Sequence, residues 1–81
     1  MEMTFLNIGF ENMVAIDKIV AIILPESASA KRLVQFAKEN HHLIDVTTGR
    51  KTRSVVVTSD QFIFLSAIQP DTLAGRLDDF V

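Results

Sequence analysis

The sequence predicts an α+β fold, a small mixed domain of mainly antiparallel strands with two helices. Three observations predict it. Residues 18–24 and 53–58 are rich in β-branched side chains, which favour strands. An apolar stripe of helical period follows Ser27, and Pro70 opens a second helical segment. With 81 residues the chain has room for a single domain over 1–81, in an order close to ββαββα with or without one extra strand.

The first strands are short and are separated by residues that break them. Residues 4–8 predict a strand that Gly9 ends. Residues 12–16 predict a second, and 18–24 form the strongest β-branched stretch of this half. Pro25 stops that stretch because proline cannot donate the next ladder hydrogen bond.

The segment after Pro25 predicts the first helix. Ser27 or Ser29 can cap its N-terminus, and Asn40 is suited to end it. Its apolar residues recur every three or four positions and predict one buried stripe, made of Ala30, Leu33, Val34 and Ala37.

The second half predicts three more strands. Residues 43–46 predict a short one, and 47–49 a turn in which glycine permits positive φ. Residues 53–58 and 61–67 follow, split by a tight turn at 59–60 that indicates a hairpin.

The second strand of that hairpin is apolar without alternation, which predicts a strand covered on both faces, by a helix on one side and by the core or another subunit on the other. Phe36, Phe62 and Phe64 are accordingly assigned to the core. Pro70 then suits the first turn of the final helix, and Asp71 favours its positive end.

The composition predicts self-association. Hydrophobic residues make up 48% of the chain and the mean hydropathy is +0.28, whereas a domain of this size buries only about 60% of its unfolded surface. A partner subunit can cover the excess, so we expect a homo-oligomer. No apolar run approaches the length of about 18 residues that a membrane helix needs, and no basic segment precedes one at the N-terminus. We therefore expect a cytoplasmic protein without a membrane partner.

Basic residues are concentrated in the middle of the chain. The net charge is −2, yet seven of the eight lysines and arginines lie within 18–53, against three acidic residues there. Such a segment can form a local phosphate-binding surface on an acidic protein, or it can be an ordinary solvated face. On the predicted helix, Lys31 and Arg32 are candidate secondary phosphate contacts.

The densest basic cluster is Gly49-Arg50-Lys51-Thr52-Arg53. If residues 51–53 are extended, Lys51 and Arg53 share one face while Arg50 projects from the turn, and Thr52 adds a hydroxyl suited to phosphate. A hairpin loop with three cations can also be a soluble edge that resists strand addition. The only aromatics are six phenylalanines, which favours duplex DNA over single strands, because single-strand binders interleave stacking rings with cations.

The chain predicts neither an enzyme nor a cofactor protein. His41 and His42 are adjacent and point in different directions, so they do not form a chelating pair, and the chain has no cysteine. Gly49 belongs to no nucleotide-binding glycine pattern. We expect no catalytic residues, no metal, no cofactor and no small-molecule substrate.

Four segments resemble one known family. Phe-Leu-Asn-Ile-Gly-Phe at 5–10, Leu-Ile-Asp at 43–45, Gly-Arg-Lys-Thr-Arg-Ser at 49–54 and Leu-Ser-Ala-Ile-Gln-Pro at 65–70 resemble the RemA-like family of bacterial extracellular matrix regulators. The resemblance runs from about residue 4 to Leu77. It implies a DNA-binding transcriptional regulator that activates biofilm-matrix operons and assembles as a ring-like homo-oligomer.

By position, the resemblance also implies which residues contact DNA. The family's DNA-contact arginines match Arg50 and Arg53, Lys51 stands where some members have a second arginine, and Lys18 matches a functional basic position. The alternative, which rests on the apolar excess and the acidic ends, is a self-assembling scaffold or protein-interaction module without nucleic-acid binding.

Overall fold

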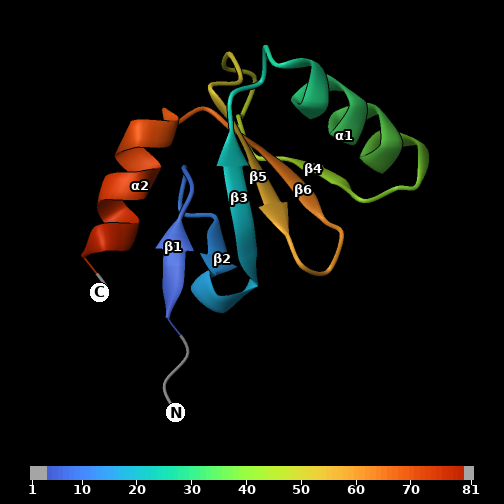
Figure 1. The fold of residues 1–81 in the computed structure, drawn as a ribbon. Coiled ribbons are helices and arrows are strands. Elements are labelled where there is room, and N and C mark those ends of the chain that lie inside the picture. Colours follow the sequence, from blue (N-terminus) through green and yellow to red (C-terminus); the bar gives the residue numbers. More distant parts are fainter. Residues whose placement is uncertain (1–3, 80–81) are drawn as a thin grey trace.

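The computed structural model describes residues 4–79, and within them the chain forms six strands and two α-helices in the order βββαβββα (Figure 1). The elements are β1 Phe5–Asn7, β2 Met13–Ala15, β3 Ile19–Ile23, α1 Ala28–Glu39, β4 Leu43–Asp45, β5 Ser54–Thr58, β6 Ile63–Ser66 and α2 Pro70–Asp78, with a 3-10 turn, η1, at Ile16–Lys18 before β3. The expected small α+β domain with two helices is confirmed, with more strands than the order ββαββα contains.

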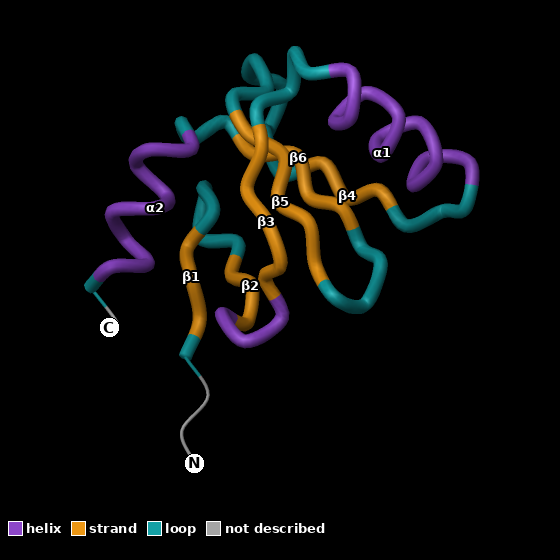
Figure 2. The backbone as a smooth tube through the Cα atoms, viewed as in Figure 1, coloured by secondary structure: helices purple, strands orange, loops and turns teal. Residues whose placement is uncertain are grey.

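The strands form a β1–β2 hairpin and a separate four-stranded sheet in the order β3-β5-β6-β4. The pairs β3–β5 and β5–β6 are antiparallel, as expected, whereas β4 pairs with β6 in parallel. Because β6 lies between β4 and β5, residues 46–53 cross over the end of β6 and are not the hairpin loop that the sequence suggested. Figure 2 shows this connection at the same end of the sheet as the β3–α1 and β6–α2 links.

The sheet is covered on both faces. The hairpin and α2 lie on one side and α1 lies on the other (Figure 1). Val55 and Val56 are adjacent in β5 and both are 0% exposed, so the strand is buried on its two faces at once. The first core contains Leu6, Ile8, Val14, Val46, Val56 and Leu73, and the second contains Ala30, Ala37, Val55 and Ile63. Double cover was expected for 61–67, and in β6 Phe64 packs against the first core while Ile63 belongs to the second, so that expectation is confirmed and this chain's own elements supply both covers.

Helix α1 begins and ends at the expected residues. The main-chain N–H of Ala30 donates to Ser27 Oγ at 3.1 Å, and Asn40 Nδ2 donates to the carbonyl of Phe36 at 2.8 Å. Ala30 and Ala37 are buried, but Leu33 is 38% exposed and lies at the edge of the stripe.

The assignment of all three phenylalanines to the core is wrong for two of them. Phe36 is 61% exposed because it lies about 120° around the helix from buried Ala30, at 3.6 residues per turn. Phe62 precedes β6 and is 39% exposed, with its ring centroid 5.0 Å from that of His42. Phe64 packs against the first core as expected.

Two buried serines tie the elements together at the end of the sheet where the links gather. Ser66 Oγ donates to the carbonyl of Ile8 at 2.6 Å and accepts from the N–H of Ile68 at 3.1 Å. Ser54 Oγ donates to the carbonyl of Ile68 at 2.8 Å. The hairpin and the β6–α2 link are therefore both held to the β5–β6 pair by hydrogen bonds that need hydroxyl side chains.

The turn between β1 and β2 is strained. The N–H of Asn12 donates to the carbonyl of Gly9 at 2.9 Å, and between them Phe10 and Glu11 have φ of 52° and 65°. Two central residues with positive φ are the mark of a type I′ turn, where glycine or asparagine is normal and a bulky side chain is costly.

Asp45 fixes the start of the connection between β4 and β5. One of its oxygens, Oδ1, accepts from the hydroxyl of Thr47 at 2.6 Å and from the N–H of Thr47 at 2.8 Å. Both hydrogen bonds stabilise the carboxylate and lower the pKa of Asp45 from its ordinary value of 3.8. The bond from the Thr47 hydroxyl has the larger effect, and the bond from the Thr47 main-chain N–H has the smaller one.

Replacing Glu11 with glycine is expected to stabilise the protein. Glycine adopts positive φ without steric cost, so Glu11→Gly should raise the free energy of unfolding by about 1 kcal/mol in urea titrations. Glu39→Gly makes the same chemical change at the helical end of α1 and should destabilise instead. Equal destabilisation by both changes would contradict the strain assigned to this turn.

The Asp45 contact predicts a pH-dependent stability difference. Because the folded-state pKa is lowered, the carboxylate contributes stability above the unfolded pKa near 3.8, and this contribution is lost as the pH falls through the folded-state pKa. Asp45→Asn should therefore be less stable than wild type at neutral pH, with the gap closing in acid. Urea unfolding of both proteins at several pH values measures it, and a gap of constant size would contradict the assignment.

Candidate nucleic-acid interface

Three of the seven basic residues of the central segment, Arg50, Lys51 and Arg53, lie on the connection between β4 and β5, at one end of the sheet. We call residues 49–53 the basic connection. Arg50, Lys51 and Arg53 are exposed there and Thr52 is half-buried. β5 begins at Ser54, so Lys51, Thr52 and Arg53 precede the strand and lead into it.

The basic connection is fixed at both ends. On one side the N–H of Arg50 donates to the carbonyl of buried Thr47 at 3.1 Å, across a turn in which Thr48 and Gly49 have φ of 56° and 80°. On the other side the N–H of Arg53 donates to the carbonyl of Ser66 at 2.8 Å. The backbone of this segment is therefore held in place while its cationic side chains extend into solvent.

Arg50 has an aromatic neighbour. Its guanidinium carbon lies 5.8 Å from the centroid of the Phe10 ring, in cation–π range. A ring face engages the flat face of a guanidinium, whereas the five N–H groups point outward in its plane. The contact can therefore orient Arg50 and leave its hydrogen-bond donors available to a phosphate.

Thr52 and Lys31 line one shallow cleft of about 360 Å³ beside the first turns of α1. The cleft places a hydroxyl and an ammonium group from distant parts of the sequence on one surface next to the basic connection. Arg32 is exposed on the same helix turn as Lys31.

Lys18 lies apart from these residues. Its carbonyl accepts from the N–H of Ser59, just beyond the end of β5, whereas Arg53 immediately precedes the start of that strand. The five strand residues between them make six steps from Arg53 to Ser59, and at about 3.3 Å per step these separate the two positions by about 20 Å. Within one subunit, Lys18 and the basic connection therefore do not form a single patch.

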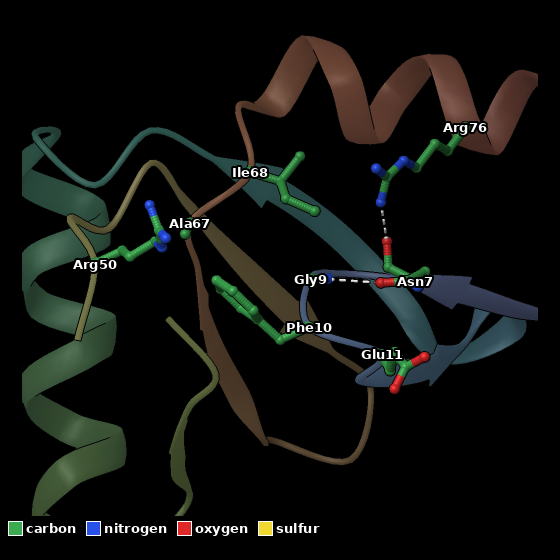
Figure 3. Close-up of a pocket in the computed structure, with 8 residues that line it drawn as sticks. All are labelled: Asn7, Gly9, Phe10, Glu11, Arg50, Ala67, Ile68 and Arg76. Carbon is green, nitrogen blue, oxygen red and sulfur yellow. Dashed lines mark hydrogen bonds between the residues drawn. The ribbon is translucent and has the colours of Figure 1, made fainter. Parts of the chain in front are cut away.

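A second cleft contains Phe10 and Arg76, which were not among the candidate site residues expected from the sequence. The β1–β2 turn, Arg50, the β6–α2 link and Arg76 of α2 enclose about 470 Å³ (Figure 3). Arg76 Nη1 donates to the main-chain carbonyl of Asn7 at 2.7 Å. Both Phe10 and Arg76 are distant from the basic connection in sequence: Phe10 ends the 5–10 segment that resembles the family, and Arg76 lies in none of the four such segments.

Charged, polar and apolar side chains together line these two clefts. In the described range 4–79, no group of three His, Asp or Glu side chains is arranged to hold a metal ion. Across the same range, no helix has the length and apolar character needed to cross a membrane.

Comparison with curated proteins finds close relatives in bacilli. Proteins of Bacillus cytotoxicus, Bacillus mycoides and Bacillus anthracis, each named "Putative regulatory protein", are 53% identical to this chain over 79 residues. The aligned region covers 98% of this chain and 91% of each relative.

A comparison with protein families agrees with the resemblance found in the sequence. Residues 5–77 match the family described as extracellular matrix regulatory protein A-like. That range includes every described strand and all of α2 except its last residue. The chain belongs to the RemA-like family, and its close relatives carry the names of regulatory proteins.

Proposed function

We propose that this protein is an oligomeric regulator of transcription that binds duplex DNA through the basic connection and activates extracellular-matrix genes. The single observation that carries the proposal is the basic connection itself, with its backbone hydrogen-bonded at both ends and Arg50, Lys51 and Arg53 exposed. The family match and the names of the relatives support the regulatory role.

The proposed contacts are mainly to the phosphate backbone. Arginine donates two parallel hydrogen bonds to a phosphate, lysine acts as a point charge, and the Thr52 hydroxyl can donate as well. Because the backbone of the connection is already ordered, little conformational entropy is lost when these groups engage DNA. Lys31, which lines a cleft with Thr52, and Arg32, which is exposed on the same helix turn, then serve as secondary contacts.

The exposed apolar surface supports assembly. Phe36, Val20 and Met13 are each more than half exposed, and together with the other exposed hydrophobic side chains they offer a subunit interface. In a ring-like homo-oligomer the basic connection is repeated at regular intervals. Weak contacts from each subunit then add to a strong overall affinity, and specificity arises partly from the deformability of the wrapped DNA.

Lys18 contributes at a separate point on the duplex. The distance of about 20 Å along β5 corresponds to about six base-pair steps at 3.4 Å each. A phosphate bound by Lys18 is therefore not the one bound by Arg53, whether the two contacts come from one subunit or from neighbours.

A self-assembling scaffold without nucleic-acid binding is the second candidate. The exposed side chains of Leu33, Phe36 and Phe62 favour it, because they supply a surface for protein contacts without any need for DNA. Both candidates are oligomers, so only DNA binding separates them.

One prediction concerns the role of the basic connection in DNA binding. The double variant Arg50→Ala/Arg53→Ala should lose binding to a labelled mixed-sequence duplex at physiological salt, measured by fluorescence anisotropy. At lower salt, the slope of log affinity against log salt should fall by about 1.8 for each subunit on the DNA, because each phosphate contact contributes about 0.9.

Lys38→Ala removes an exposed cation near the C-terminal end of α1 and should leave that slope unchanged. Light scattering should report the same oligomer for all three proteins. Failure of the double variant to assemble would overturn the role given to the two arginines, and absence of wild-type binding even at low salt would favour the scaffold.

Another prediction is that substitutions at Lys18 and at Arg53 have additive effects on DNA binding. Lys18→Ala and Arg53→Ala alter sites about 20 Å apart, so their effects on the free energy of DNA binding should add within about 0.5 kcal/mol. A double-mutant cycle measured by anisotropy tests this, with Arg50→Ala and Arg53→Ala as the neighbouring pair for comparison. Strong coupling between Lys18 and Arg53 would mean that they hold the same phosphate.

A further inference from the structure

The cleft between the β1–β2 turn and α2 places a second arginine beside the proposed DNA surface. Figure 3 draws Arg50 and Arg76 on opposite sides of this cleft, with Phe10 between them. Arg50 belongs to the basic connection, whereas Arg76 is the only basic residue after Arg53 in the sequence. The fold therefore extends the cationic surface to a residue from an otherwise acidic segment.

The charge of Arg76 is not neutralised by its hydrogen bond. The acceptor is a neutral main-chain carbonyl, that of Asn7, and the bond uses one of the five N–H groups of the guanidinium. A half-buried guanidinium at the edge of an open cleft keeps its full positive charge and further donors for an anion.

We propose that the DNA strand held by the basic connection continues across this cleft, and that Arg76 contacts a further phosphate of the same backbone. The inference rests on the proposed function and deepens it by naming an additional contact. The two arginines lie on opposite sides of the cleft, so a ligand with several phosphates along one strand fits them better than a single phosphate ion does.

Phe10 forms the apolar floor between the two arginines. Its ring is 51% exposed and lies against Arg50, and its backbone is held at a φ of 52° that a bulky residue rarely adopts. Strain of this kind persists where the surrounding structure imposes it and is concentrated at binding sites. The β1–β2 turn thus keeps the Phe10 ring against Arg50, on the Arg50 side of the cleft that the DNA strand would cross.

Glu11 opposes the proposed contact. Its carboxylate lies on the same turn and lines the same cleft, so it repels a phosphate that approaches Arg76. In this cleft two guanidinium groups face one carboxylate, and Asp79, which lines a neighbouring cleft together with Arg76, adds a second opposing charge.

The decisive experiment separates the charge of Arg76 from its hydrogen bond. Arg76→Gln keeps a donor for the Asn7 carbonyl but removes the charge, whereas Arg76→Lys keeps the charge. Anisotropy with the same duplex should show the salt slope reduced by about 0.9 per bound subunit in Arg76→Gln and retained in Arg76→Lys. Thermal unfolding checks that both variants are folded.

Glu11→Gln provides the opposite change. Removing the carboxylate should raise DNA affinity several-fold at low salt, while Glu39→Gln, which changes an exposed carboxylate at the end of α1, serves as the matched control. An equal gain in both variants would indicate a general charge effect and overturn the role of the cleft.

The outcomes distinguish this inference from the proposed function. If wild type binds DNA and loses it in Arg50→Ala/Arg53→Ala, while Arg76→Gln keeps the full salt slope, only the contact at Arg76 is overturned. If Arg76→Gln and Arg76→Lys weaken binding equally and lower the unfolding temperature together, Arg76 acts through its bond to Asn7 and the inference also fails. If wild type shows no salt-dependent binding, the proposed function itself fails.

Discussion

Burial of the β5–β6 pair on both faces is the constraint on which the rest of the structure depends. Val55 and Val56 point to opposite sides, so one strand needs two separate apolar covers. Helix α1 supplies one, and the β1–β2 hairpin with α2 supplies the other. A chain of this length can cover both faces only with short elements, which explains why so many apolar side chains at the outer surfaces stay exposed.

The same constraint places the candidate site. Covering elements on both faces require links that cross the end of the sheet. Three connections gather there, namely β3–α1, β4–β5 and β6–α2 (Figure 2). The connection over β6 carries the basic residues, and Ser66 holds it through its carbonyl while its hydroxyl holds the hairpin. Polar backbone at this end is thus satisfied by buried serines, and cationic side chains remain free for an outside partner.

The fold, more than the order of residues in the sequence, decides which charged side chains lie near one another. An acidic chain presents Arg50, Lys51 and Arg53 on a rigid segment, adds Lys31 from α1, and brings Arg76 to the far side of the neighbouring cleft. It also separates Lys18 from the basic connection by the length of β5. A surface of this kind suits an extended polyanion that is contacted at several points, each of them weak.

The sequence by itself determined the two helices, the caps of α1, the turn at Gly49 and the cluster of cations after it, because propensity, capping and hydrophobic period act over a few neighbouring residues. It also predicted the doubly buried strand from unbroken apolar residues. Only the tertiary structure decided that β4 pairs in parallel with β6, that Phe36 faces solvent, and that Phe10 and Arg76 join Arg50 while Lys18 does not. Strand order and the meeting of distant side chains depend on how the elements pack across many residues, and local patterns do not record that packing.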